Sequence, residues 1–504
     1  MFIDARKITE DAVQDRVCII GAGAAGITLA LELEDRGIPV TVLESGGMER
    51  EAVNQDLARG DITGRIYFAL DNSRLRYFGG CTNHWAGLCR PMDTIDFENR
   101  AHIPESGWPF GRETLTPYYE RARYYLGLDR FPDVDRPGTA ATFPDKGDRE
   151  FELDYEQFSP LVRMGDRFRK RIERSKLIKV YLYANVTEFA TNENSRLNSV
   201  TARTLPEFGG RALNVSADRF VLATGGIENA RILLLTERNH RVGLGNRHEN
   251  VGRYFMEHLH AIGGILALRT ADFPYAAYRR ANRRQGFLRL RDELQNELGL
   301  LNCRMILEEA GEIDAGPLSS SVFDVSARMD DARNANDTRL MHVKFISEQA
   351  PTRESYVGLS DQLDPDPLGQ ARAALHWKVS DLDKRTIDAN LWALARAMGR
   401  EGHGRLQIRA GSRAAWKWNF LAGGNHHMGT TRMSTDPKRG VVDADCRLFD
   451  IENFYVAGSS VFPNTGHANP TYTVVAMAVR LAEHLGRESA AVTLSGQRGT
   501  TSRT

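Results

Sequence analysis

Three glycines near the start of the chain have the spacing of a dinucleotide-binding turn. Gly21, Gly23 and Gly26 follow the apolar run 16–20 and lead into the helical pattern 27–36. The first glycine permits a tight turn, the second lets a pyrophosphate approach the backbone, and the third lets the helix pack against the strand. The helix N-terminus then offers free N–H groups and a positive dipole end to the phosphates. The spacing therefore predicts a dinucleotide site.

A carboxylate follows the second strand expected in this βαβ unit. Glu44 comes 18 residues after Gly26 and directly after the apolar run 40–43. At that position it can accept hydrogen bonds from a ribose diol, and it would repel a 2′-phosphate, which disfavours NADP. The glycine pattern itself does not distinguish FAD from NAD.

Composition excludes several classes of protein. The 504 residues contain 66 Lys and Arg and 66 Asp and Glu, and this zero net charge argues against nucleic-acid binding as the main activity. A hydrophobic content of 41% and a charged content of 26% are ordinary for a globular protein. The five cysteines are an odd number without C-x-x-C spacing, so neither a disulfide scaffold nor a four-cysteine zinc site is expected.

No segment has the pattern of a secretory signal or a membrane span, and we expect a cytoplasmic protein. The strand and helix patterns indicate an α/β protein with a Rossmann-like dinucleotide domain and an inserted α+β domain built on an antiparallel sheet. The predicted division of the chain is 1–110, 177–264 and 421–488 for the discontinuous dinucleotide domain, 111–176 for a helical and loop excursion, 265–420 for the substrate domain, and 489–504 for a disordered tail.

Further motifs occur in a fixed order along the chain. They are Gly79-Gly-Cys-Thr-Asn-His-Trp85, Ser106-Gly-Trp-Pro109, Val251-Gly-Arg-Tyr-Phe-Met-Glu-His258, Asn425-His-His-Met-Gly-Thr-Thr-Arg-Met433 and Gly466-His-Ala-Asn-Pro-Thr471. Together with the glycine turn, they resemble the glucose–methanol–choline (GMC) oxidoreductases, nearly end to end. The likeness is greatest to the branch of pyranose oxidases, sugar dehydrogenases and glycoside 3-oxidases.

The resemblance implies an enzyme that binds FAD and oxidises an alcohol to a carbonyl. By position in the motifs, His426 is the catalytic base and Asn469 the second catalytic residue, with His467 as a competing candidate. The flavin N5 accepts a hydride from the carbinol carbon while an imidazole takes the hydroxyl proton, typically contributing about 10²–10⁴-fold. An asparagine can hold the hydroxyl by hydrogen bonding but cannot act as a base.

The resemblance also implies the residues that hold the cofactor. They are Gly21, Gly23, Gly26, Glu44, Gly80, His84, Val186 and Gly458. His84 matches a position that is covalently bonded to the flavin in pyranose oxidase but not in some sugar dehydrogenases, so a covalent link and a shape-filling histidine both stay open. No metal is expected, because the pairs His426-His427 and His258-x-His260 lack further ligands at suitable spacing.

The predicted reaction is the oxidation of a secondary alcohol of a sugar, glycoside or cyclitol to a ketone, with O₂ or another compound as electron acceptor. The alternatives are a hydroxynitrile lyase-like or other non-redox family member, a dehydrogenase of a non-sugar alcohol, an NAD-dependent dehydrogenase, and a flavin-holding scaffold without activity. The predicted partner is a small molecule rather than nucleic acid, and an oligomer is possible. Six arginines between 279 and 291 indicate either a solvated surface segment, or a mobile substrate loop or a contact to an acidic partner or an anionic substrate.

Overall fold

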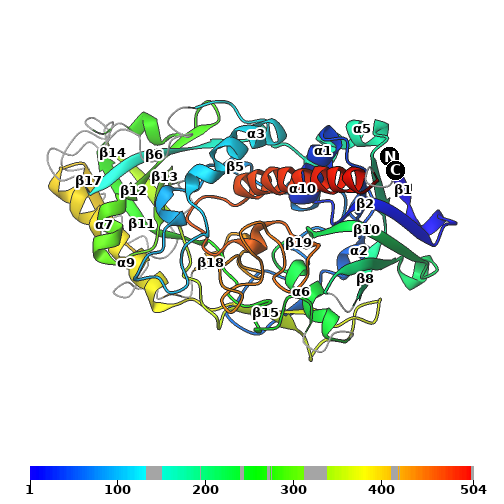
Figure 1. Ribbon diagram of the computed structural model, residues 1–504. Helices are drawn as coiled ribbons and strands as arrows, with labels where there is room; N and C mark the ends of the chain where they lie inside the picture. Colours follow the sequence, from blue (N-terminus) through cyan, green and yellow to red (C-terminus); the bar gives the residue numbers. More distant parts are fainter. Residues whose placement is uncertain are drawn as a thin grey trace.

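The computed structural model describes residues 1–131, 150–192, 195–238, 243–269, 273, 275–310, 338–409, 418 and 421–500. Within them, three β-sheets and their helices form an elongated molecule (Figure 1). Residues 132–149, within the predicted excursion 111–176, lie outside the described residues. None of the helices in the described part has the combination of length and apolar sequence that a bilayer span needs.

The first sheet takes strands from three separated parts of the chain, in the order β1-β7-β3-β2-β10-β9-β8, with β19 beside β10. The pairs from β1 to β10 and the pair β10–β19 are parallel, whereas β9 and β8 are antiparallel. Parallel strands buried on both faces read as continuous apolar runs, as 17–20 and 40–43 do. The strand bounds are β1 Phe2–Asp4, β2 Ala12–Ile20, β3 Val40–Leu43, β7 Ile178–Leu182, β8 Asn185–Thr191, β9 Leu197–Arg203, β10 Ala212–Leu222 and β19 Phe454–Val456.

Helices cover this sheet and connect its strands. The helix α1, Ala24–Asp35, follows the glycine turn directly, and α10, Thr471–Thr500, packs against both α1 and α3 (Figure 1). The apolar face of α10 is buried from Tyr472 to Leu485. This burial holds the first half of the helix against the dinucleotide unit. The remaining helices here are α2 Ala52–Asp56, α3 Thr116–Leu126, α5 Met164–Arg174 and α6 Glu228–Leu235.

The second sheet is antiparallel throughout and has the order β17-β11-β14-β13-β12-β6-β5, with β18 beside β11. The helix α9, Asp381–Arg400, packs against β17, β14 and β13 and so covers one face of the sheet, and α7, Asp292–Leu298, connects β12 to β13. The strand bounds are β5 Leu88–Cys89, β6 Phe151–Phe158, β11 Leu259–Arg269, β12 Arg284–Leu290, β13 Cys303–Glu309, β14 Thr338–Ser347, β17 Gly404–Ile408 and β18 Ala422–Gly423. One mainly parallel sheet and one antiparallel sheet confirm the predicted fold class.

The strands cross the predicted division of the chain in several places. β5, β6 and β18 join the second sheet although they lie outside 265–420. A third sheet pairs β15, Tyr356–Leu359, and β16, Ala373–His376, with β4, Gly60–Ile62. Long-range pairing of two- and three-residue strands leaves no hydrophobic period in the sequence, so pattern analysis cannot assign such strands.

The predicted disordered tail 489–504 is wrong for its first part, because α10 continues to Thr500. Its Ser, Thr and Gly residues suggested a coil. Once a helix has formed and is anchored by a buried face, however, each added residue only has to fix its own backbone and gains one hydrogen bond, so the helix extends easily. The last four residues lie outside the described part of the chain.

Candidate active site

A cavity of about 950 Å³ runs from the glycine turn after β2 to the second sheet. At one end it is lined by the glycine turn and Glu44, and at the other by His260 of β11 and Ile306 of β13. Between these ends lie residues from both C-terminal motifs, including His426 and Asn469. The cavity therefore joins the predicted dinucleotide site to the predicted catalytic residues.

The glycine turn has the geometry that its spacing predicts. Gly21 has a φ of +101°, and a Cβ there would lie 2.7 Å from the carbonyl oxygen of Ala223. A Cβ on Gly26 would lie 1.9 Å from the Gly21 oxygen, so only glycine lets α1 pack this closely. Gly23 lines the cavity, and a Cβ on it would meet no atom within 4 Å. Its open side is the space that a pyrophosphate would take.

The Glu44 side chain is held in place by two backbone amides. Ala22 N donates to one carboxylate oxygen and Gly46 N to the other, each at 2.9 Å. Burial raises the pKa of Glu44, and these hydrogen bonds oppose that shift. Each oxygen keeps a further lone pair for a ribose hydroxyl.

The other predicted cofactor residues also lie along the cavity, except Gly26, whose role is in packing. Gly80, His84, Val186 and Gly458 are among the lining residues. A Cβ on Gly458 would meet nothing within 4 Å, so a second open glycine faces the same space as Gly23. Burial, with Arg163 nearby, lowers the pKa of His84, which keeps its imidazole neutral. The glycine cradle, the buried carboxylate and the length of the cavity fit FAD.

The two predicted catalytic side chains face each other. Asn469 Nδ2 lies 3.1 Å from His426 Nε2, and the other ring nitrogen of His426, Nδ1, lies 2.9 Å from Nδ1 of His258. Arg304 Nη2 donates to Asn469 Oδ1 at 2.7 Å. Because an arginine only donates, Asn469 must turn its oxygen to Arg304 and its NH₂ group to His426.

The contacts of His258 determine which nitrogen of His426 carries hydrogen. His258 Nε2 lies 3.4 Å from the backbone oxygen of Thr465, and a carbonyl only accepts, so Nε2 carries the hydrogen of a neutral imidazole. Burial keeps the pKa of His258 well below its usual value, so this ring is neutral. Its Nδ1 then accepts from Nδ1–H of His426, which leaves the lone pair of His426 on Nε2, toward Asn469.

The backbone around His426 is anchored by Glu257. The Glu257 carboxylate accepts from the amides of His426 and Gly424 at 2.9–3.0 Å, and from the hydroxyl of Tyr67. Burial raises the pKa of Glu257 to about 7. Burial lowers the pKa of His426 to about 3, with a smaller effect from Arg304, so the imidazole is neutral across the physiological range.

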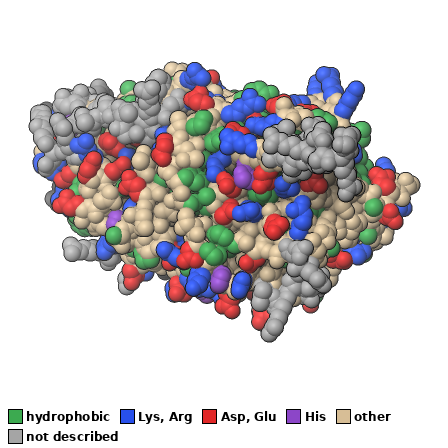
Figure 2. Space-filling view, viewed as in Figure 1, with side chains coloured by type: hydrophobic (Ala, Val, Ile, Leu, Met, Phe, Trp, Pro, Cys, Tyr) green, Lys and Arg blue, Asp and Glu red, His purple; other side chains and the backbone are tan. Residues whose placement is uncertain are grey.

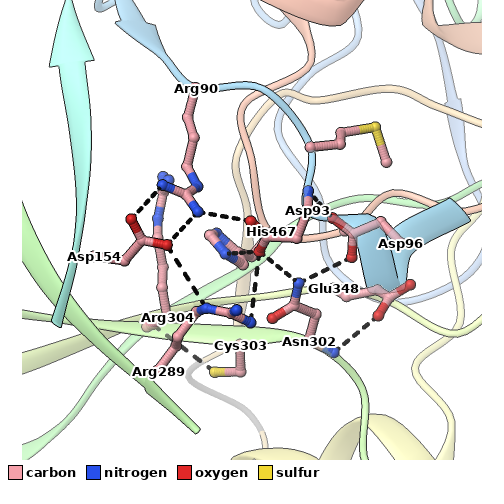
Figure 3. A network of polar contacts seen from close by, with 12 residues as sticks. Arg90, Asp93, Asp96, Asp154, Arg289, Asn302, Cys303, Arg304, Glu348 and His467 are labelled. Atoms are coloured by element: carbon pink, nitrogen blue, oxygen red, sulfur yellow. Dashed lines mark hydrogen bonds and ion pairs between the residues drawn. The ribbon is translucent and has the colours of Figure 1, made fainter. Parts of the chain in front are cut away.

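The competing candidate His467 occupies a different environment. Its Nε2 lies 2.9 Å from Asp93 Oδ2, and its side chain is fully buried and is not among the cavity-lining residues. Figure 3 shows it within a buried network of polar contacts. The labelled residues of the network are Arg90, Asp93, Asp96, Asp154, Arg289, Asn302, Cys303, Arg304, Glu348 and His467. Of these residues, Arg304 is the one that reaches Asn469.

Three histidines meet at the catalytic end, which the sequence did not indicate. Nitrogens of His258, His260 and His426 lie within 4.8 Å of one another. His426 is therefore the third possible metal ligand that the spacing around His258-x-His260 did not reveal. The 2.9 Å separation between His258 and His426 is that of a hydrogen bond, which already accounts for their contact.

Comparisons with known proteins agree with this geometry. The family model "FAD dependent oxidoreductase" matches residues 16–242, and the model "GMC oxidoreductase" matches 351–478, which includes His426 and Asn469. The two matches together support membership of the GMC oxidoreductases. The chain is an FAD-dependent oxidoreductase that acts on CH–OH groups.

Several relatives show how far this likeness extends. The 6'''-hydroxyparomomycin C oxidase of Streptomyces lividus is 26% identical and aligns over 96% of this chain and 94% of its own. The C-glycoside 3-oxidase of Microbacterium trichothecenolyticum is 33% identical, over 26% of this chain and 24% of its own. Pyridoxine 4-oxidase from Mesorbium loti shares the fold, with a TM-score of 0.58, 17% identity, and coverage of 93% and 99% of the two chains.

Sequence motifs pointed to the predicted catalytic pair, His426 and Asn469, but not to the residues that contact this pair. His258 closes one of the family motifs, yet nothing in the sequence indicates its contact with His426, which is 168 residues away. Arg304 lies in a strand without a motif and reaches Asn469 across 165 residues. Its contact could be found only by pairing the strands of the second sheet.

Proposed function

We propose that this GMC oxidoreductase oxidises a secondary alcohol of a sugar, glycoside or cyclitol ring to a ketone, with His426 as the base. The observation that carries the proposal is the pair His426 Nε2 and Asn469 Nδ2, 3.1 Å apart in a cavity that also contains the dinucleotide turn. Bound FAD supplies the acceptor for the hydride that leaves the carbinol carbon.

The side chains of this pair provide for the proton. In the structure the lone pair of His426 Nε2 accepts from Asn469 Nδ2; a substrate hydroxyl that displaces this contact can donate to the lone pair instead, and the neutral ring can then take the proton. Asn469 Nδ2 can donate to the same hydroxyl oxygen and hold it while its carbon is oxidised. Arg304 and His258 keep the two groups in the required orientation.

The relatives support a carbohydrate substrate. The protein that aligns over nearly the whole chain is named for the oxidation of an aminoglycoside, and the relative with a higher identity over a shorter segment is named as a C-glycoside 3-oxidase. Their names agree on a glycosidic substrate and differ in the position that is oxidised.

Anaerobic flavin reduction tests the proposal. Purified enzyme is mixed with a set of sugars and glycosides without air, and bleaching of the flavin absorbance is followed. We expect bleaching by at least one secondary alcohol, and recovery of the absorbance when O₂ or an artificial acceptor is added. A His426→Ala variant should bleach about 10²–10⁴ times more slowly at neutral pH. An equal rate would refute His426 as the base, and no bleaching by any alcohol would favour a non-redox family member.

Covalent attachment at His84 is tested separately. Acid precipitation releases noncovalent FAD into the supernatant, whereas flavin bonded to an imidazole stays with the pellet. A His84→Ala variant provides the control, because it cannot form the bond. Complete release from the wild-type protein would exclude the link.

A further inference from the structure

The face of the second sheet that points away from α9 lines the catalytic end of the cavity. Strand register places His260 of β11 opposite Ile346 of β14, which in turn lies opposite Arg304 of β13. On the next two strands of the sheet, Gln285 of β12 lies opposite Glu156 of β6. Side chains alternate between the faces of a strand, so these residues share one face of the sheet.

This face combines an apolar centre with a polar surround. Phe287, Ile306 and Ile346 form a small buried cluster of their own, separate from the main core. Around it stand side chains that can donate or accept hydrogen bonds, and each of them lines the cavity. They are Glu156, His260, Tyr278, Gln285 and Lys344.

Three of these side chains have buried polar atoms without a hydrogen-bond partner among the described residues. They are Nε2 of His260, the hydroxyl of Tyr278 and both carboxylate oxygens of Glu156. One Glu156 oxygen lies 2.7 Å from Arg304 Nη1 as an ion pair, without a directed hydrogen bond. A buried polar group without a partner costs about 1–3 kcal/mol, and native proteins satisfy nearly all of them with protein, water or ligand.

The chemistry of these atoms indicates what their partner presents. A carboxylate only accepts, whereas a phenol and a neutral imidazole each donate or accept. A ligand with several hydroxyl groups satisfies all three, since each hydroxyl both donates and accepts. The apolar cluster between them suits the C–H face of a saturated ring. A polyhydroxylated ring therefore matches this surface.

Charge restricts the ligand further. Among the described residues, the carboxylates that line this end of the cavity are each close to a cation: Glu156 to Arg304, Glu308 to Lys344 at 3.6 Å, and Glu309 to Arg339 at 2.8 Å. Arg279 and Arg280 line the cavity as well. No carboxylate here is left over for an ammonium group, and a cationic ligand would face an excess of positive charge. On the surface view, Lys and Arg side chains are likewise interspersed with Asp and Glu (Figure 2).

We propose that this surface is a carbohydrate-ring subsite in which Glu156, His260 and Tyr278 bind hydroxyl groups that are not oxidised, and that it selects uncharged glycosides over aminoglycosides. The inference rests on the proposed function and refines its substrate class. It also departs from the relative that aligns over most of the chain, which is named for an aminoglycoside.

Calorimetry with the FAD-loaded enzyme tests the selection. An uncharged methyl glycoside and paromomycin, an aminoglycoside, are titrated in turn under anaerobic conditions, and flavin reduction is recorded in the same samples. We expect the uncharged glycoside to bind at least tenfold more tightly. Equal or tighter binding of paromomycin would overturn the proposal. If the glycoside binds but does not bleach the flavin, the subsite stands and the proposed oxidation fails.

A pair of tyrosine variants tests the contacts. Tyr278→Phe removes a hydroxyl that has no protein partner, whereas Tyr275→Phe in the same short helix removes one that already donates to Glu309 at 2.7 Å. Loss of one neutral hydrogen bond corresponds to about a 2- to 13-fold weaker binding of the glycoside by Tyr278→Phe. The Tyr275→Phe control should change the affinity less than twofold. An unchanged affinity in Tyr278→Phe, with an unchanged FAD content, would contradict the assignment.

Discussion

The hydrogen bond between His258 and His426 gives the sharpest prediction. In the structure, Nδ1 of His258 accepts from Nδ1–H of His426 at 2.9 Å and so keeps the lone pair of His426 on Nε2. His258→Leu removes that acceptor. The two neutral tautomers of His426 then approach equal energy, so only about half of the molecules keep the lone pair on Nε2, and the rate of flavin reduction should fall about twofold.

The matched control is His258→Gln. A glutamine can accept from His426 Nδ1–H through its oxygen and donate to the backbone oxygen of Thr465 through its NH₂ group, as the imidazole does. We expect it to restore most of the rate at unchanged substrate KM. Single-turnover reduction in an anaerobic stopped-flow instrument measures both variants. A loss in His258→Leu as large as that in His426→Ala would refute the positioning role, as would equal rates in Leu and Gln variants.

Two further predictions follow from the site. The pKa of Glu257 is raised from its usual 4.5 to about 7, so the folded state binds a proton more tightly than the unfolded state. The free energy of unfolding should therefore fall by up to about 3 kcal/mol as pH rises from 4.5 to 7. Glu257→Gln should remove this part of the pH dependence, measured by denaturant titrations. An identical pH dependence in the wild-type protein and the variant would refute the prediction. Gly23→Val should reduce bound FAD, measured as the ratio of flavin to protein absorbance, with little change in the melting temperature of the apoprotein, because its Cβ meets no atom within 4 Å. Gly26→Ala, whose Cβ would lie 1.9 Å from a backbone oxygen, should instead lower the melting temperature; the reverse result would contradict the assigned roles.

Local patterns in the sequence predicted the elements that carry their own periodicity. The strand before Gly21 and the helix after it have such patterns, and the structure places β2 and α1 there. The very short strands β5 and β18 have no such signal, since two residues cannot show a period of two. Their places follow from tertiary pairing alone.

The candidate site divides in the same way. Family motifs led to His426 and Asn469, which the structure brings within hydrogen-bonding distance. Arg304 and Glu156 form an ion pair from two strands that are more than a hundred residues apart, and neither lies in a motif. A buried charge is paired with an opposite charge that the fold brings close to it. Such a partner can be identified from the structure but not from the spacing of residues in the sequence.

The strands β5, β6 and β18 determine where the chain can be cut without breaking the second sheet. All three come from parts of the chain outside 265–420, and together they complete the sheet at both of its sides. A fragment cut out at those bounds would expose the unpaired edge of β12, which normally binds β6 along seven residue pairs. Such an edge invites aggregation. Grafting the second sheet of this enzyme onto another flavoprotein would therefore require transplanting these flanking strands as well.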